Sequence, residues 1–193
     1  GGVMRLENLI ADIDEEMFTK IVENRSVRDK DARDTAKIVG LAAIKYGDLS
    51  NQATKDYIFD VDRFTSFEGN TGPYILYTIV RIKSILNKYK ESGKSMDDIK
   101  ILSATSESEK ALMLEAAKFG SVMENVYEEL APHKICAYIY DLANAFNRFY
   151  HETKILAEED EQKQKSYIAL LTLTRDILTT CIDLLGFEAP ERM

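Results

Sequence analysis

The sequence predicts an all-α fold, a helical bundle, and three observations predict it. Apolar residues recur at helical spacing along nearly the whole chain. Only three prolines occur, and each lies at the start or beyond the end of a predicted helix. The connecting segments are short relative to the helices, which favours one bundle over separate layers. At 193 residues the chain is long enough to bury a sizeable core.

The first part of the chain predicts two helices and a mixed segment. Residues 3–24 carry apolar side chains at near-helical spacing, and residues 27–47 predict a second helix with an apolar stripe. Residues 51–64 are mixed. Their apolar run Tyr57-Ile58-Phe59 fits either a short helix or a packed loop.

A helix over residues 73–90 follows the turn Gly-Asn-Thr-Gly-Pro. Asn70 or Thr71 can supply the N-cap oxygen, and Pro73 suits the first helical position. This helix has one narrow apolar face, formed by Ile75, Ile79, Ile82 and Leu86. A different face carries aromatic, basic and polar side chains, namely Tyr74, Tyr77, Arg81, Ser84 and Lys88.

The second half of the chain predicts a surface loop and three more helices. The loop lies at residues 92–95, and a helix runs from Ser106–Ser108 to about Leu130. Pro132 starts a strongly amphipathic helix whose apolar side comprises Ile135, Ile139, Leu142, Phe146, Phe149 and Tyr150. The last helix covers residues 162–185, with Gly186 as its C-terminal stop and a seam of Leu171, Leu178, Ile182 and Leu185.

The polar face of the 73–90 helix has the side chains needed to hold unpaired bases. Aromatic rings stack on bases, and arginine and lysine contact phosphates or base edges. The net charge of −8 argues against a non-specific nucleic-acid binder. However, residues 72–94 carry one arginine and four lysines against a single glutamate, so this helix is a local basic island. Helix–helix packing of the tyrosines is the alternative interpretation of the same face.

Motifs for catalysis are absent from the sequence. The two histidines, His133 and His151, have no metal-ligand spacing, and no phosphate-binding loop occurs. Cys136 and Cys181 lie in apolar helical patterns and form no Cys-x-x-Cys pair, which predicts buried, reduced thiols and a cytoplasmic protein. We therefore predict no catalytic residue and no metal ligand in this chain, which disfavours an autonomous enzyme.

Several segments resemble arginyl-tRNA synthetase, in the C-terminal anticodon-binding (DALR) domain of that family. The resemblance is carried by segments in the same order and spacing, at residues 36–50, 56–60, 66–86, 130–150 and 184–193. It implies an all-α helical bundle of the class Ia aminoacyl-tRNA synthetase anticodon-binding type. Residues 2–9 resemble the segment that comes directly after the KMSKS loop of the family. Residues 1–25 would then follow a catalytic domain, and residues 26–193 would form the anticodon-binding domain.

The resemblance also implies that catalysis and tRNA binding lie in different parts of the parent enzyme. The parent enzyme would join arginine to its tRNA using ATP and Mg²⁺, whereas this chain would need no cofactor and would be inactive alone. Its partners would be the anticodon stem-loop of an arginine tRNA and its own catalytic domain, with no membrane and a monomeric state expected. The alternative is a helical protein-interaction module that does not bind nucleic acid.

The family's anticodon-contacting positions correspond to Tyr74, Tyr77, Arg81, Tyr150 and the terminal Met193. Together with Ser84 and Lys88 from the same helix face, these form the predicted tRNA site. Two parts of the chain depart from the family pattern: Thr78-Ile79-Val80 replaces an alanine-rich stretch, and residues 90–106 match nothing in it.

Overall fold

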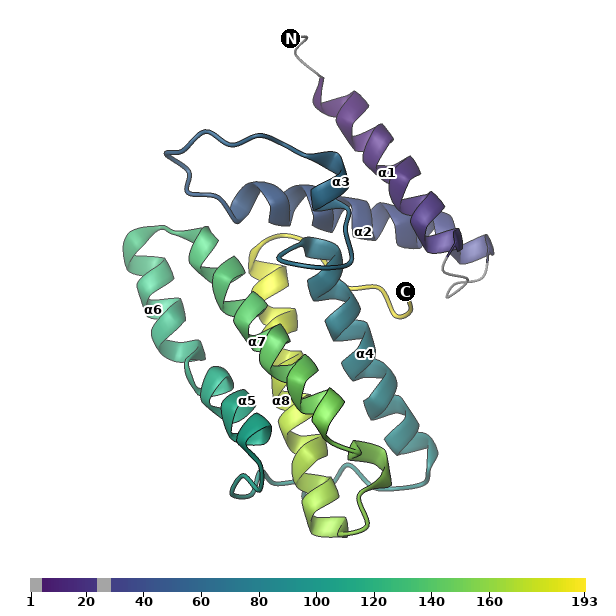
Figure 1. Ribbon diagram of the computed structural model, residues 1–193, viewed down its shortest axis with the longest axis vertical. Helices are drawn as coiled ribbons and strands as arrows, with labels where there is room; N and C mark the ends of the chain where they lie inside the picture. Colours follow the sequence, from purple (N-terminus) through teal and green to yellow (C-terminus); the bar gives the residue numbers. More distant parts are fainter. Residues whose placement is uncertain (1–4, 24–28) are drawn as a thin grey trace. The chain divides into compact units, whose positions relative to one another are not determined.

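A computed structural model describes residues 5–23 and 29–193, and this part of the chain is helical without a strand (Figure 1). The predicted all-α fold is confirmed. The chain forms two compact units. The first comprises residues 1–80 and 182–193, and the second comprises residues 81–181. The elements are α1 (Leu6–Glu23), α2 (Asp29–Leu49), α3 (Val61–Phe64), α4 (Gly72–Glu91), α5 (Glu107–Ala117), α6 (Phe119–Glu129), α7 (Pro132–Glu152), the 3₁₀ turn η1 (Ile155–Ala157) and α8 (Glu161–Leu184).

In the first unit, α1 packs against α2. The contact buries Ile13, Met17 and Ile21, which recur at helical spacing on one side of α1. The ends of the predicted helix over residues 3–24 lie outside the described residues, and its body agrees with α1. Leu6 and Ile10 lie near the start of α1 and are exposed, so part of its apolar surface is uncovered in this chain.

The mixed segment before α4 is a packed loop followed by one helical turn, α3. The rings of Tyr57 and Phe59 lie edge-on to the ring of Phe64, with centroid distances of 6.2 and 4.5 Å. The Tyr57 hydroxyl donates to Asp48 Oδ1 at 2.6 Å. Ile58 between them is 88% exposed. Of the two interpretations, the packed loop is therefore the one observed.

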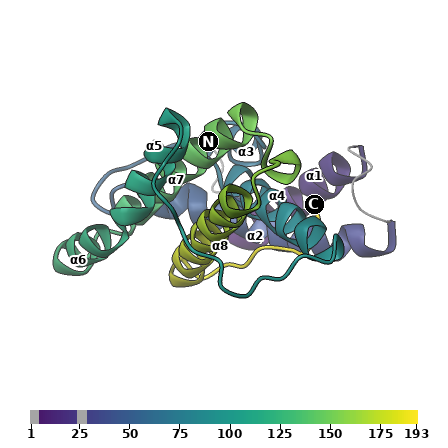
Figure 2. The same cartoon turned by 90° about the horizontal axis from the view of Figure 1, so that it is seen from below.

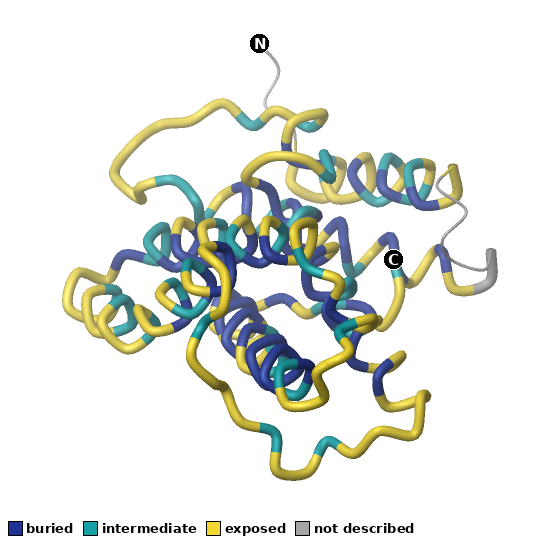
Figure 3. The backbone as a smooth tube through the Cα atoms, turned by 60° about the horizontal axis from the view of Figure 1, so that its bottom comes forward, coloured by how far each residue is buried: buried dark blue, intermediate teal, exposed yellow. Residues whose placement is uncertain are grey.

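In the second unit, α7 lies at the centre of the packing. Both α5 and α6 contact α7, and α8 runs beside it in both views (Figures 1 and 2). The apolar sides predicted for α7 and α8 are buried, except that Tyr150 is partly exposed. Burial is concentrated in the helices, whereas the connecting segments are mostly exposed (Figure 3).

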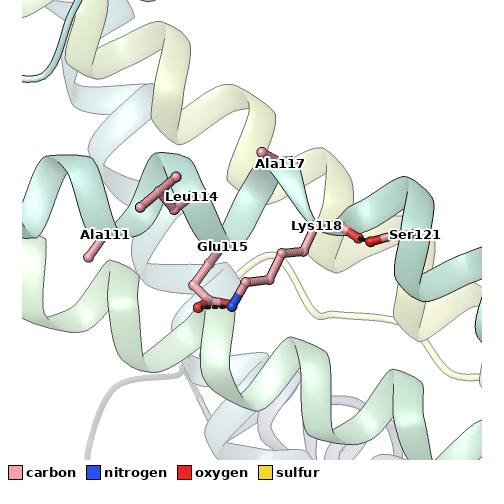
Figure 4. Close-up of a pocket in the computed structure, with 6 residues that line it drawn as sticks. All are labelled: Ala111, Leu114, Glu115, Ala117, Lys118 and Ser121. Carbon is pink, nitrogen blue, oxygen red and sulfur yellow. Dashed lines mark hydrogen bonds and ion pairs between the residues drawn. The ribbon is translucent and has the colours of Figure 1, made fainter.

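The prediction of one helix from residues 106–108 to residue 130 is wrong in one respect. Two helices, α5 and α6, occupy this stretch and are separated at Lys118 (Figure 4). Lys118 ends α5, its N–H bonding back three residues to the carbonyl of Glu115 at 3.2 Å, and it also precedes the first turn of α6. The sequence after it is Phe-Gly-Ser, and a glycine–serine pair is a common site of helix kinks. The start was predicted correctly, since the Ser106 side chain accepts the N–H of Glu109.

Residues 92–105 cross from α4 to α5 without regular structure (Figure 2). Two side chains of α8 hold this segment. Lys94 Nζ donates to Gln164 Oε1, and the Leu102 N–H donates to Ser166 Oγ at 2.9 Å. Gln164 is buried and also donates to the carbonyls of Ile155 and Leu156. Residues 92–105 are therefore attached through two polar side chains of α8.

Gly186 ends α8 as predicted, in a left-handed conformation with a φ of 80°. The Phe187 N–H donates to the Ile182 carbonyl at 3.1 Å and the Gly186 N–H donates to the Asp183 carbonyl at 2.9 Å, which is the Schellman arrangement. Phe187 and Ile182 are both buried, as the hydrophobic contact of that motif requires. Lys45 of α2 donates to the Gly186 carbonyl at 2.7 Å. The C-terminal segment is thus anchored within the first unit.

Both cysteines are buried in the second unit, and burial raises the pKa of each thiol to about 12. The thiolate is the nucleophile, so at pH 8 only about one thiol in ten thousand would be reactive. We expect Ellman's reagent to leave both thiols unmodified in the folded chain and to titrate both after denaturation. Rapid modification of the folded chain would contradict the observed burial.

No helix in the described part of the chain combines the length and the apolar character that crossing a membrane requires.

Candidate nucleic-acid interface

Thr71 caps α4. Its Oγ1 accepts the N–H of Tyr74 at 3.2 Å and donates to the Ser66 carbonyl at 2.6 Å. Asn70, the other candidate, instead accepts the Tyr46 hydroxyl of α2 at 2.5 Å. The helix begins at Gly72, so Pro73 occupies its second position, one residue later than predicted.

Gly72 lets the start of α4 approach the backbone of α2 within the first unit. A Cβ atom at this position would lie 2.3 Å from the Ala42 carbonyl oxygen and 2.6 Å from its carbonyl carbon. Only glycine allows so close a contact between two backbones. Together with the hydrogen bond from Tyr46 to Asn70, this contact determines where α4 starts.

The two predicted faces of α4 are both observed. The apolar face of Ile75, Ile79, Ile82 and Leu86 is buried. On the other face, Tyr74 and Arg81 are half-buried, whereas Ser84 and Lys88 are exposed and Tyr77 is 40% exposed. Burial of the isoleucine face therefore leaves ring surface and positive charge of this helix accessible to a ligand.

The structure joins Arg81 to α7, which the sequence presents only as a separate amphipathic helix. Arg81 Nη1 donates to Asn147 Oδ1 at 2.5 Å. The Arg81 guanidinium carbon lies 5.0 Å from the centroid of the Tyr150 ring, a cation–π arrangement. Asn147 and Tyr150 are three residues apart and therefore lie on one side of α7. These three residues, all in the second unit, form what we call the arginine–tyrosine cluster.

Tyr150 has further aromatic neighbours on its own helix. The Phe146 ring, which is fully buried, stacks on it at 6.0 Å with an interplanar angle of 27°. His151 lies edge-on at 5.6 Å. Tyr150 nevertheless remains 37% exposed, so part of a ring held by a buried neighbour is accessible.

Asn147 is the residue of this cluster that the sequence analysis missed. It belongs to the run Phe-Asn-Arg-Phe-Tyr, whose tyrosine was identified, but an asparagine on an amphipathic helix is ordinarily a solvent-facing residue. One signal in the sequence could have identified Asn147. It stands three residues before Tyr150, and this spacing places both residues on the same side of the helix.

Met193 is half-buried and belongs to the first unit, as do Tyr74 and Tyr77. Phe187 and Pro190 of the same terminal segment are buried, which anchors the segment ahead of Met193. Arg81, Ser84, Lys88 and Tyr150 belong to the second unit. That all seven predicted residues share one surface stays a prediction.

The candidate site offers side chains that can bind a ligand. Nowhere in the described ranges do three or more His, Cys, Asp or Glu side chains gather as a metal site would require. An arginine, a lysine, a hydroxyl and partly exposed tyrosine rings can contact phosphates and stack on unpaired bases. The fold is thus that of an all-α domain, and its arginine–tyrosine cluster has side chains of the kinds that bind unpaired RNA bases.

Comparison with known proteins agrees with this class. The family described as "DALR anticodon binding domain" matches residues 75–193. An arginine–tRNA ligase of Agathobacter rectalis is 63% identical over the whole chain, which covers 34% of that protein. One of Alkaliphilus oremlandii is 53% identical over the whole chain, covering 33% of it. The chain spans about a third of the length of these relatives.

Solved structures show the same likeness. The arginyl-tRNA synthetase of Thermus thermophilus superposes on all of this chain, and on 33% of its own, with a TM-score of 0.89 and 27% identity. That of Plasmodium falciparum superposes on 99% of this chain, and on 34% of its own, with a TM-score of 0.85 and 30% identity. The chain belongs to the DALR anticodon-binding domain family.

Proposed function

We propose that this chain is the anticodon-binding part of an arginine–tRNA ligase and that it holds the anticodon loop of an arginine tRNA. The observation that carries the proposal is the arginine–tyrosine cluster, which places a cation against a partly exposed aromatic ring. It occurs in a chain of the DALR family whose similar proteins include arginine–tRNA ligases. Aromatic and cationic side chains together are what recognition of unpaired RNA bases requires.

In this proposal the seven residues divide by chemistry. The rings of Tyr74, Tyr77 and Tyr150 stack on bases, and Met193 packs near the anticodon. Arg81 and Lys88 contact phosphates or base edges, and the Ser84 hydroxyl can donate to either. The exposure of Tyr77 and Tyr150 and the local excess of lysines support these roles.

The whole ligase would carry out the chemistry elsewhere. Its catalytic domain would use ATP and Mg²⁺ to join arginine to the tRNA, while this chain positions the anticodon end and performs no reaction. The exposed apolar residues of α1 suit a contact with that domain. We further propose that the ligase acts as a monomer in the cytoplasm.

Tyr77→Ala and Arg81→Ala test the site directly. Each should weaken binding by about 1–3 kcal/mol, because a base would lose a stacking surface or a charged contact. The measurement is fluorescence anisotropy of a labelled RNA hairpin with the anticodon stem-loop sequence of an arginine tRNA. Tyr127→Ala is the control, since Tyr127 is an 83% exposed ring on α6, outside the site. Unchanged affinity in both site variants, with the fold intact, would overturn the assignment.

The same titration repeated at several salt concentrations separates RNA recognition from a protein-interaction module. Binding through phosphate contacts weakens as salt rises, whereas docking of apolar surfaces does not. Hairpin binding that strengthens or stays constant with rising salt would favour the second interpretation.

A further inference from the structure

His151 lies beside the partly exposed ring of Tyr150 and is itself exposed. The centroids of the two rings are 5.6 Å apart, and the ring planes are inclined by 64°. The tyrosine ring is also contacted by the buried ring of Phe146 on α7 and by the Arg81 guanidinium on α4. Contacts with two helices therefore hold the ring beside which the imidazole lies.

The charged side chains that flank His151 on α7 bind each other. Arg148 Nε donates to Glu152 Oε1 at 3.1 Å. Hydrogen bonds from Ser108 of α5 and from Arg148 hold the pKa of the Glu152 carboxyl below its usual value. Among the residues that the structure describes, neither ring nitrogen of His151 has a hydrogen-bond or ion-pair partner. The imidazole nitrogens are therefore available to a ligand.

An imidazole in this place suits the edge of a nucleobase. A base that stacks on Tyr150 lies nearly parallel to its ring, and an imidazole inclined by 64° to that ring can meet the edge of the base. A neutral imidazole has one donor and one acceptor nitrogen, and base edges present both kinds of group. A phosphate presents only acceptors, so it would use one of the two nitrogens.

From this arrangement we infer that His151 is a further RNA-contacting residue: its ring nitrogens bond to the edge of the base that stacks on Tyr150. This inference rests on the proposed function, since it takes Tyr150 as a stacking surface. It adds a residue that can distinguish one base from another. Stacking accepts every base, whereas hydrogen bonds to a base edge depend on which groups the base presents.

The place of His151 in the last turn of α7 allows a purely structural role as well. A positive charge there interacts favourably with the helix dipole, and this interaction requires no RNA. Loss of the structural role would lower the midpoint of thermal unfolding and leave the affinity of the folded chain for RNA unchanged. The two roles therefore differ in what they change.

His151→Phe tests the inference, because it keeps a flat ring beside Tyr150 and removes both nitrogens. The Kd of the chain for the arginine-tRNA anticodon hairpin, measured by fluorescence anisotropy, should rise about two- to tenfold, the usual effect of losing one hydrogen bond. The measurement is repeated with hairpins that each lack one base of the loop. Tyr150→Ala identifies the base in question, because its own loss of affinity disappears when that base is missing. With that hairpin, His151→Phe should bind as the unmodified chain does.

His133→Phe is the matched control. His133 is the other histidine of the chain, and it lies in the first turn of α7, at the opposite end of the helix from Tyr150. The same chemical change at this position should leave the affinity for every hairpin close to that of the unmodified chain.

The outcomes separate this inference from the proposed function. If His151→Phe binds every hairpin like the unmodified chain while Tyr150→Ala weakens binding, the inference is wrong and the proposed function stands. A loss of equal size on all the hairpins would also overturn it, because His151 would then contact no particular base. If the unmodified chain does not bind the complete hairpin, both proposals fall. If His151→Phe is poorly folded, His151→Ala replaces it in the same comparison, since alanine favours helix.

Discussion

We expect Gly72→Ala to destabilise the chain by about 3 kcal/mol or more, because a methyl group at this position has no room. Its Cβ would lie 2.3 Å from the Ala42 carbonyl oxygen, and the neighbouring atoms are backbone rather than a flexible side chain. To relieve the overlap, the start of α4 must move away from α2. That movement also strains the Thr71 cap and the hydrogen bond from Tyr46 to Asn70.

Gly120→Ala is the control for this substitution, and its effect should have the opposite sign. A Cβ built on Gly120 would meet no side chain or neighbouring element within 4 Å, and this residue is in the first turn of α6. Alanine favours helix over glycine by about 1 kcal/mol, so the variant should be as stable as the unmodified chain or more so. Thermal unfolding followed by circular dichroism measures both. Equal midpoints for the two variants would show that α4 does not need the close approach to α2.

Phe146→Ala should cost about 3–5 kcal/mol of stability, the usual loss for a buried phenylalanine. Phe146 is completely buried on α7, and its ring stacks on Tyr150. Since whole domains are stable by only about 5–15 kcal/mol, this variant should melt many degrees lower. It should also release the Tyr150 ring, so RNA binding should weaken at temperatures where the chain is still folded.

Two further variants separate packing from the specific role of the ring. Phe146→Leu keeps most of the apolar volume and removes the aromatic stack, so it should lose less stability while still weakening RNA binding. Tyr127→Ala removes an aromatic ring that is 83% exposed, and surface changes of this kind alter stability by no more than about 0.5 kcal/mol. A Phe146→Ala chain as stable as Tyr127→Ala would contradict the burial of this ring.

Predictions from the sequence were most accurate where one helix by itself decides the outcome. The isoleucine face of α4, the apolar side of α7 and the stop of α8 at Gly186 were all predicted correctly. Each follows from spacing along one helix or from the conformational freedom of glycine.

The prediction was wrong at the α5–α6 break and left the N-cap of α4 open, because local signals did not decide either. The break at Lys118 interrupts a stretch whose apolar spacing continues through it, so periodicity alone did not reveal it. Asn70 and Thr71 both suit an N-cap, and the choice between them depended on Tyr46, which is far away in the sequence and takes the Asn70 side chain as its acceptor.

The all-α class, the basic helix with its two faces and the family of this protein could be predicted without a structure, because helical periodicity and motif order are properties of the amino-acid sequence. Only the tertiary structure showed that Arg81 lies between Asn147 and Tyr150. Those residues are on a different helix, and which side chains of two helices meet depends on how the helices pack. The arrangement of the arginine–tyrosine cluster could therefore be derived only from the folded chain.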